Sequence, residues 1–176
     1  RERQRIASAA AGMVEEGQCV MIDSGTTNRA VARELRRFSS LTVVTNSVDI
    51  AMELANAQFE VIVAGGTLRG KSFSTVGPLI EDVLERMSAD ILFLGADGFD
   101  PEIGVTSPSL QESRVGRAMV KAAKRVVAVC DSSTFTRLSL SRMVPPTAIH
   151  CVITDCGLPA ATADALRTQN IEVVTV

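Results

Sequence analysis

The sequence predicts an α/β fold built on a mainly parallel sheet with helices on both faces. Two observations carry this prediction. Short runs rich in Val and Ile recur along the chain with few polar interruptions, and segments with helical spacing of apolar residues separate most of them. Strands that are apolar at nearly every position are buried on both sides, which requires a layer of helices above and below the sheet. The 176 residues suffice for a single domain of this kind, spanning residues 1–176.

The expected elements follow in order from the first residues. A basic lead-in opens a helix that carries Ile6, Ala9, Ala10, Met13 and Val14 on one face. Strands are expected at residues 19–22, 41–45, 61–64, 91–94, 126–130, 151–154 and 172–176. Helices are expected at residues 28–37, 48–56, 79–87, 112–124 and 160–169. Because crossovers between parallel strands are right-handed, the strand-to-helix loops should all lie at the carboxyl ends of the strands.

The composition narrows the class of protein. Hydrophobic residues make up 46% and charged residues 22% of the chain, as in a globular protein, and no apolar run is long enough to cross a bilayer, so no membrane partner is expected. The formal net charge of −2 gives this segment no electrostatic reason to bind nucleic acid by itself. Any contact with DNA must therefore come from another part of the protein.

The cysteines favour a structural role. Cys19, Cys130 and Cys151 lie in or beside strand candidates, Cys156 follows closely, and no CxxC spacing occurs. With His150 as the single histidine, a zinc cluster is not expected, and nothing else implies a metal or a cofactor. Reduced thiols and the absence of a signal peptide predict a cytoplasmic location.

The loop at residues 23–27 is the most informative local feature. An apolar strand runs there into Asp23, Ser24, Gly25, Thr26 and Thr27, which open a helix. Backbone N–H groups at a helix start have no intrahelical partners, and the helix dipole places partial positive charge there. Gly25 lets the backbone approach a ligand closely. The loop therefore predicts an anion site, and the alternative is that Thr26 or Thr27 merely caps a helix.

Four further loops share the same edge of the predicted sheet, at residues 45–47, 65–69, 95–98 and 131–133. Each is rich in small polar residues, and each by itself could be an ordinary tight turn. Arg69 can donate a bidentate pair to a phosphate, while carboxylate and amide groups suit sugar hydroxyls. Together the loops predict a site for a phosphorylated polyol. The candidate contacts from these loops are Asn46, Ser47, Gly65, Gly66, Arg69, Asp97, Gly98 and Asp131.

Several ordered motifs together resemble a known family. They are Leu-Thr-Val-Val-Thr-Asn-Ser at 41–47, Gly65-Gly66 with Arg69, Gly-Ala-Asp-Gly at 95–98, Glu112 with Arg-Ala-Met at 117–119, and Asp-Ser-Ser at 131–133 with Phe135. This series resembles the C-terminal sensor domain of DeoR-type bacterial transcriptional repressors over nearly the whole chain. The resemblance implies a fold like that of ribose-5-phosphate isomerase and a phosphorylated sugar as effector. It also implies self-association as a dimer or tetramer, and operator DNA binding through an upstream winged helix-turn-helix domain absent from residues 1–176.

The resemblance also assigns roles within the site. It places the phosphate in the loop 24–27, in agreement with the backbone argument, and it likens Asp97 and Glu112 to the carboxylates that flank the reacting carbon of the isomerases. Here they are expected to hold hydroxyl groups. The chain departs from the family at Thr134 and Thr136, where many members carry Lys and Gly. Either Arg69, Lys71 or another basic residue supplies the missing charge, or the effector differs in its polar contacts.

Three classes of function remain open at this point: a sensing domain of a transcription regulator, an active sugar-phosphate isomerase or deaminase of the same fold, and a pure assembly domain. An isomerase needs a base and a cation that steadies the enediolate oxygen, and no loop lysine matches the isomerases. Binding without turnover is therefore expected. The segment 104–109 before Glu112, with Arg114 and residues 117–119, looks like repressors of N-acetylgalactosamine or galactosamine utilisation, which implies a phosphorylated amino sugar.

Two other segments allow two interpretations each. Arg114, Arg117 and Lys121 recur at helical spacing and form a basic stripe, which is either a solvated face or a contact for a ligand or subunit. Residues 137–146 are polar and end in two prolines, so they form either an ordinary connection or a short strand or flap beside the site.

Overall fold

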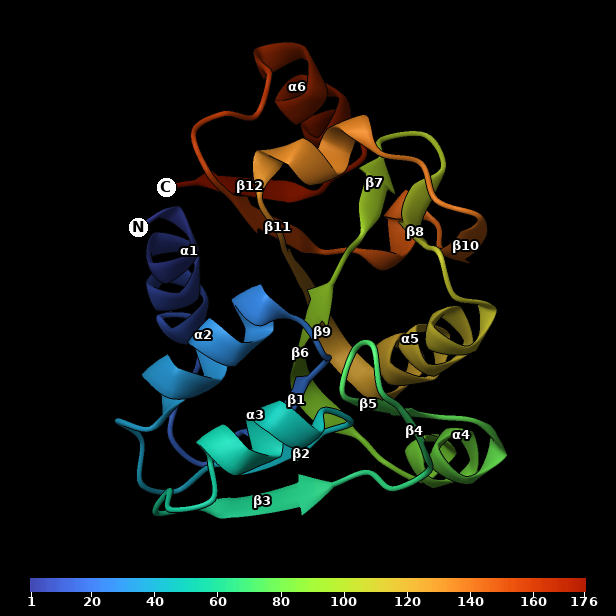
Figure 1. Cartoon of the computed structure of the whole chain (residues 1–176). Coiled ribbons are helices and arrows are strands. Elements are labelled where there is room, and N and C mark those ends of the chain that lie inside the picture. Colours follow the sequence, from blue (N-terminus) through green and yellow to red (C-terminus); the bar gives the residue numbers. More distant parts are fainter.

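The computed structural model, which describes residues 1–176, is organised around a seven-stranded sheet in the order β12-β11-β9-β6-β1-β2-β3 (Figure 1). Every neighbouring pair in this sheet is parallel. The strands are β1 (Cys19–Ile22), β2 (Thr42–Thr45), β3 (Glu60–Val63), β6 (Ala89–Gly95), β9 (Ala123–Val129), β11 (Cys151–Thr154) and β12 (Glu172–Thr175). The predicted parallel sheet is thus confirmed, with all seven expected strands in it.

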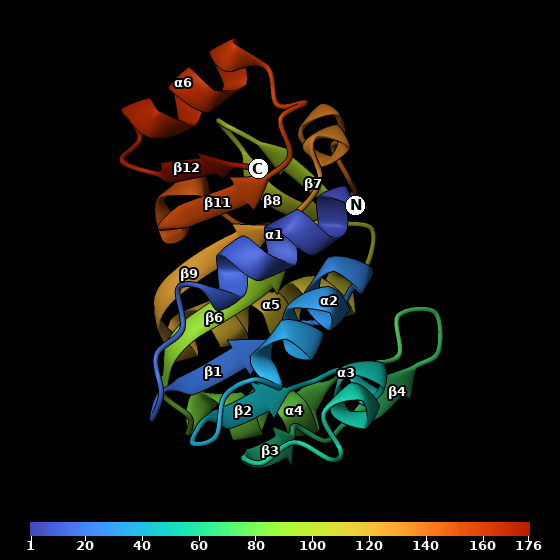
Figure 2. The same cartoon turned by 90° about the vertical axis from the view of Figure 1, so that its left-hand side faces the viewer.

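Helices cover both faces of the sheet. On one face lie α1 (Glu2–Ala11), α2 (Thr26–Leu35) and α3 (Val48–Glu53), which Figure 2 shows in front of the strands. On the other face lie α4 (Pro78–Glu85) and α5 (Leu110–Ala122), while α6 (Ala160–Thr168) packs beside β12. None of these helices has the length and hydropathy needed to cross a membrane.

Successive side chains of each strand point to opposite faces of the sheet, and they thereby form two separate hydrophobic cores. Ile22 and Phe93 point into the core under α1 to α3, whereas Met21 and Leu92, their neighbours in the chain, point into the core under α4 and α5. All four side chains are fully buried. Because successive residues of a strand face opposite sides, burial on both faces requires apolar residues at consecutive positions, which is the pattern of the sequence.

The boundaries of several elements differ from those expected. The helix expected at 112–124 begins at Leu110 and ends at Ala122, and β9 follows it directly from Ala123 instead of 126. The helix expected at 48–56 ends at Glu53. Helix boundaries are weakly encoded because the last turn lacks the full set of backbone hydrogen bonds.

Two small antiparallel elements lie outside the main sheet, and only the short strand within residues 137–146 was among the expectations. One is the hairpin of β4 (Thr67–Arg69) and β5 (Ser74–Val76), and the other is a three-stranded sheet of β10 (Ser141–Val144), β8 (Gly104–Ser107) and β7 (Gly98–Asp100). Residues 137–146 therefore contain a short strand, β10, and are not merely an irregular connection. Single turns of 3-10 helix, η1 (Ser132–Thr136) and η2 (Pro146–Ala148), flank β10 in the chain.

The strand order places a crevice between β1 and β6. After β1 the chain moves to β2 and β3 on one side, and it then returns to β6 on the other side of β1. The loops that leave β1 and β6 therefore diverge. Open α/β sheets bind their ligands at such a switch point, outside the carboxyl ends of the strands.

Candidate functional site

A cleft of about 460 Å³ lies at this switch point. Its walls come from the loops after β1, β2, β6 and β9, the tip of the β4–β5 hairpin and the first turn of α5. The residues that line it are Asp23, Ser24, Gly25, Thr26, Thr27, Asn28, Arg29, Asn46, Asp49, Lys71, Ser72, Phe73, Gly95, Ala96, Asp97, Ser107, Glu112, Val129, Cys130, Asp131, Thr134, Arg137 and Met143.

The structure brings most of the expected site residues together in this cleft. Those in the lining are Asp23, Ser24, Gly25, Thr26, Thr27, Asn46, Lys71, Asp97, Glu112 and Asp131, whereas Ser47, Gly65, Gly66, Arg69 and Gly98 lie outside it. Ser47 caps α3, and Gly65 and Gly66 join β3 to β4. A Cβ at Gly98 would lie 2.6 Å from the carbonyl oxygen of Arg137, so this glycine permits the close packing of β7.

The start of α2 presents free backbone donors to the cleft. Gly25 occupies the N-cap position with φ 125° and ψ 157°, and no side chain caps the helix. The first helical hydrogen bond runs from the Arg29 N–H to the Gly25 carbonyl at 2.9 Å, so the N–H groups of Thr26, Thr27 and Asn28 have no acceptor in the chain. The interpretation of Thr26 or Thr27 as the cap is therefore wrong, because both lie inside the helix.

Asp23 ties the loop after β1 to the end of β6. Its Oδ1 accepts from the Ser24 N–H at 2.8 Å, and its Oδ2 accepts from the Gly95 N–H at 3.2 Å. Burial raises the pKa of the Asp23 carboxyl to about 7. The two hydrogen bonds lower this pKa, whereas the negative charges of Glu112 and Asp97 raise it further. The carboxyl group therefore exchanges a proton near neutral pH.

Two further carboxylates face Asp23 from other elements. Burial and the charge of Glu112 raise the pKa of Asp97, while Arg69, Arg137 and a hydrogen bond from Ser107 lower it. Glu112 lies in the first turn of α5, where its Oε1 lies 3.3 Å from Arg69 Nη1 and accepts from the Ser74 hydroxyl at 3.3 Å. Arg69 thus holds a carboxylate of the cleft and does not itself line the cleft.

The cations of the cleft are Arg29, Lys71 and Arg137. Arg29 pairs with Glu53 at 3.3 Å, and Arg137 Nη2 donates to the Ser133 hydroxyl at 3.1 Å, whereas Lys71 makes no ion pair. Arg29 and Arg137 escaped the sequence reasoning because one lies inside a helix and the other in an irregular connection. Arg29 follows the anion loop 23–27 closely, which is the signal that could have indicated it.

Two buried amides complete the inner wall. Asn28 is 1% exposed, and its Nδ2 donates to the carbonyls of Phe93 at 3.2 Å and Ser24 at 3.4 Å. Asn46 is 2% exposed, and the Oδ1 atoms of both amides have no hydrogen-bond partner. Buried polar atoms are nearly always paired in folded proteins, so these two acceptors are exceptions, and both belong to residues that line the cleft.

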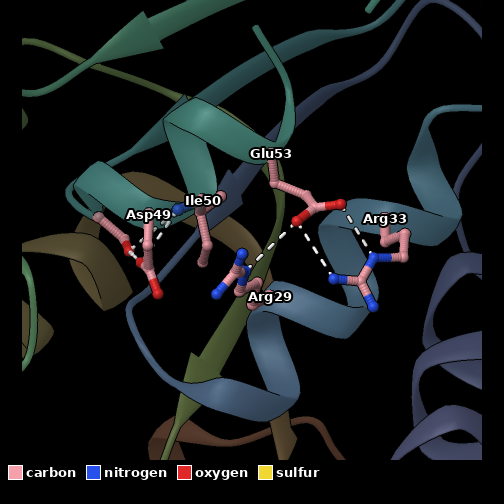
Figure 3. Close-up of polar contacts among 6 residues, drawn as sticks. Arg29, Arg33, Asp49, Ile50 and Glu53 are labelled. Carbon is pink, nitrogen blue, oxygen red and sulfur yellow. Dashed lines mark hydrogen bonds and ion pairs between the residues drawn. The ribbon is translucent and has the colours of Figure 1, made fainter.

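The rim on the α3 side is fixed by ion pairs and a cap (Figure 3). Glu53 on α3 pairs with both Arg29 and Arg33 on α2, the second at 2.9 Å. Ser47 Oγ accepts from the Ile50 N–H at 3.4 Å and is hydrogen-bonded to the Asp49 carboxylate, which lines the cleft. The ion pairs couple α2 to the last residue of α3, and the cap fixes the first turn of α3.

The basic stripe of α5 contacts the rest of the domain and stays outside the cleft. Arg114 pairs with Glu81 on α4 at 2.9 Å, and Arg117 Nη1 donates to the Arg142 carbonyl on β10 at 3.0 Å. Lys121 is exposed.

Of the cysteines, Cys130 lines the cleft, and burial raises the pKa of its thiol to about 12, so it is a neutral part of the wall.

The family profile of the DeoR C terminal sensor domain matches residues 1–156. The chain belongs to this family. Over 175 residues the sensor domain is 36% identical to a protein of Escherichia coli O157:H7 named as a putative aga operon transcriptional repressor, covering 99% of this chain and 65% of the relative. It is 37% identical to the HTH-type transcriptional regulator GlpR of Haloferax volcanii, covering 98% and 68%. The chain thus spans about two thirds of the length of these relatives.

Solved structures confirm the predicted fold. Ribose 5-phosphate isomerase A from Methanocaldococcus jannaschii matches with a TM-score of 0.56 and 16% identity, over 76% of this chain and 53% of that one. The delta subunit of eIF2B from Chaetomium thermophilum matches with a TM-score of 0.58 and 19% identity, over 86% and 54%. At this level of identity the likeness concerns the fold alone.

Proposed function

We propose that this sensor domain binds a phosphorylated sugar or amino sugar in the cleft and thereby controls operator binding by a transcriptional regulator in the cytoplasm. The observation that carries the proposal is the row of unpaired N–H groups at the start of α2, which faces carboxylates and buried amide oxygens across one cleft. A small ligand with an anionic group could accept hydrogen bonds from these N–H groups. Hydrogen-bond donors on the same ligand could pair with the carboxylates and amide oxygens.

The phosphate belongs at the start of α2. Thr26, Thr27 and Asn28 offer backbone donors at the positive end of the helix dipole, which is the usual environment of a bound phosphate. Of the three lining cations, Lys71 makes neither an ion pair nor a side-chain hydrogen bond, and it replaces the charge that Thr134 lacks. Charge-assisted hydrogen bonds of this kind are roughly twice as strong as neutral ones.

The sugar belongs between Asp97, Glu112 and Asn46. Carboxylates and amide oxygens accept hydrogen bonds from sugar hydroxyls, and a carboxylate pair also attracts the ammonium group of an amino sugar. The names of the relatives agree with this class of ligand. One is a glycerol-3-phosphate regulon repressor of Escherichia coli K12, 31% identical over 98% of this chain and 69% of the relative, and its name contains a phosphorylated polyol.

A sugar-phosphate isomerase remains the second candidate, because Lys71 lies in the same lining as Asp97 and Glu112. An isomerase needs a base together with a cation near the enediolate oxygen. Arg69 already neutralises Glu112 at 3.3 Å, which favours holding a hydroxyl over abstracting a proton. Product analysis after incubation with galactosamine 6-phosphate should detect no turnover, and turnover that Glu112→Gln abolishes would favour the isomerase.

Calorimetry with matched ligands tests the binding proposal. Galactosamine 6-phosphate should bind at least roughly 100-fold more tightly than galactosamine, because the phosphate alone reaches the N–H groups of α2. Lys71→Ala should weaken binding of the phosphate by about 10-fold, whereas Lys121→Ala, a change of the same kind outside the cleft, should leave it unaltered. Equal affinity for the two ligands would refute the phosphate site.

Gly25 is a poor position for such a test. Its φ of 125° lies in a region that side chains with a Cβ rarely adopt, although a Cβ there would meet no other atom within 4 Å. Gly25→Val would therefore strain the backbone as well as obstruct the ligand, and a loss of binding would not separate the two effects.

A further inference from the structure

Phe73 is an exposed aromatic residue in the wall of a polar cleft. Its side chain is 56% exposed and belongs to neither hydrophobic core. The other apolar residues of the lining are small or buried: Val129, Cys130 and Met143 are all less than 10% exposed, and Ala96 carries only a methyl group. Phe73 is therefore the single large apolar surface that the lining offers to a ligand.

The backbone holds Phe73 in an unfavourable conformation. Its φ of 52° is in the left-handed region, where a bulky side chain is an outlier and Gly or Asn is the usual choice. The Phe73 carbonyl accepts from the Val48 N–H at 2.8 Å, and the next residues are held by an Ser47–Ser74 bridge and a hydrogen bond from the Thr75 N–H to the Asn46 carbonyl at 2.8 Å. An aromatic ring in a strained, exposed position is a sign of function.

The hairpin that carries Phe73 stands beside the strand ends. Figure 2 shows the loop between β4 and β5 projecting at the end of the sheet toward which the strand arrows point. Arg69 and Ser74, at the two sides of this loop, both contact Glu112 at 3.3 Å. The loop is thus anchored to the carboxylate wall, and its tip residues Lys71, Ser72 and Phe73 all line the cleft.

The chemistry of a ring-form sugar matches this arrangement. A pyranose or furanose ring carries hydroxyl groups around its edge and exposes C–H groups on its faces, so that one face buries apolar surface against a flat aromatic ring. A linear polyol has the same hydroxyl groups but no flat C–H face. A binding site can therefore distinguish a cyclic ligand from its open-chain counterpart if it combines polar groups around the ring edge with one aromatic surface against the ring face.

We propose that Phe73 packs against the C–H face of a cyclic sugar phosphate and makes the cleft select the cyclic form over a linear polyol phosphate. This inference rests on the proposed function and names the ligand class for the same site. It gives the strained conformation at Phe73 a purpose, because this residue lines the cleft and belongs to neither hydrophobic core.

The test compares one ligand in two forms. Borohydride reduction converts galactosamine 6-phosphate into its linear alditol phosphate, which keeps the amine and the phosphate. Calorimetry should show the native domain binding the cyclic form about 10-fold more tightly than the alditol. Phe73→Leu should remove this preference by weakening the cyclic form only, and Phe73→Tyr should restore it. Leu79→Ala, which alters another exposed apolar side chain outside the cleft, is the matched control.

Each other outcome has a defined meaning. Equal binding of the two forms by the native domain, or an unchanged preference in Phe73→Leu, would overturn the inference and leave the phosphate site intact. Absence of binding of both forms would overturn the proposed function and this inference with it. A change of oligomeric state in Phe73→Leu, measured by sedimentation, would assign the ring to a contact between copies instead. Phe73→Asn tests folding, because Asn tolerates φ 52° and should melt no lower than the native domain.

Discussion

Asp23 shows how one residue connects the fold to the chemistry of the cleft. Asp23 directly follows β1, and its carboxyl group accepts the N–H groups of Ser24 and of Gly95 at the end of β6 and faces two further carboxylates. Its position follows from the strand order, since only the switch point brings the ends of β1 and β6 to one side chain. The consequence is a group that titrates within the physiological range.

This titration predicts a specific pH dependence of stability. The pKa of Asp23 rises from 3.8 to about 7 on folding, chiefly through burial, so the unfolded chain releases its proton first. The Asp23 contribution to the free energy of unfolding should therefore be largest below about pH 4, fall as the pH rises to about 7, and stay constant above. Carboxyl ¹³C NMR of the folded domain should show the Asp23 midpoint near pH 7, and Asp23→Asn should remove the decline in stability over this range.

A matched change at Asp164 is the control for this measurement, since its carboxylate is 76% exposed on α6. Asp164→Asn should leave the decline unaltered. A midpoint for Asp23 near pH 4 would contradict the effect of burial.

At the scale of single residues, the sequence predicted the candidate site best where a motif acts through free groups of the backbone. The loop 23–27 was found because Gly and hydroxyl residues between a strand and a helix create free N–H groups, whatever the tertiary structure. Arg137 and Phe73 could not be found in this way. They reach the cleft only through a connection and a hairpin whose geometry depends on contacts with distant residues.

The helices α2 and α3 illustrate how elements hold the rim of the cleft in place. Glu53 is 12% exposed in its side chain and accepts hydrogen bonds from Arg29 and Arg33, which lie one turn apart on α2 (Figure 3). The hydrogen bond from Arg33 is the main reason that the pKa of Glu53 falls to about 2, against the opposing effect of burial. One carboxylate thus fixes two turns of the helix that begins at the loop 23–27.

Removal of this carboxylate should destabilise the domain at neutral pH but not in acid. A folded pKa of about 2, below the usual value of 4.5, means that the stabilisation is complete above about pH 4.5 and is lost as the pH falls toward 2. Glu53→Gln should lower the melting temperature by roughly 2–4 °C at pH 7 and have no effect near pH 2. Glu85→Gln, at an exposed carboxylate without an ion pair, should leave the melting temperature unchanged at both pH values. A shift of equal size at both pH values would exclude the ion pairs as its cause.

At the scale of elements, the strands of the parallel sheet were predictable, whereas most of the antiparallel strands were not. Seven apolar runs sufficed for the main sheet because its inner strands are buried on both faces and therefore apolar at consecutive positions. The hairpin β4–β5 has three residues in each strand, and Ser74 and Thr75 interrupt its apolar pattern. Such strands gain their stability from neighbours such as Asn46 and Ala64, which accept hydrogen bonds from Thr75, so no local periodicity reveals them.

At the scale of the whole molecule, the cleft lies next to the helix that opens the chain. A second cavity of about 260 Å³ is lined by Glu2, Arg3 and Ile6 of α1 together with Thr27 and Asp131, which also line the main cleft. A ligand that moves Thr27 or Asp131 therefore acts on the first turn of α1. Because the family is defined as a C-terminal sensor domain, we expect a DNA-binding domain to join the chain on this side.

This arrangement predicts that the isolated domain does not bind an operator, whereas the full-length regulator does so in a ligand-dependent manner. The domain carries a net charge of −2, which gives it no overall attraction to DNA phosphates, and the arginines of α5 contact α4 and β10. A ligand acts at a distance only if it binds two conformations or assemblies with different affinity, and a typical coupling of about 1–3 kcal/mol corresponds to a roughly 5- to 150-fold change in operator affinity.

Fluorescence anisotropy measures both parts of this prediction on operator DNA selected by the full-length protein. Saturating galactosamine 6-phosphate should shift the titration of the full-length protein by that factor, and Lys71→Ala should require more ligand for the same shift, because the coupling passes through the occupied cleft. Residues 1–176 alone should not alter the anisotropy at the same concentrations. Specific retention of the operator by residues 1–176, or an operator affinity that saturating ligand leaves unchanged although calorimetry shows binding, would rule out the sensor function, because a sensor must transmit its occupancy to the DNA.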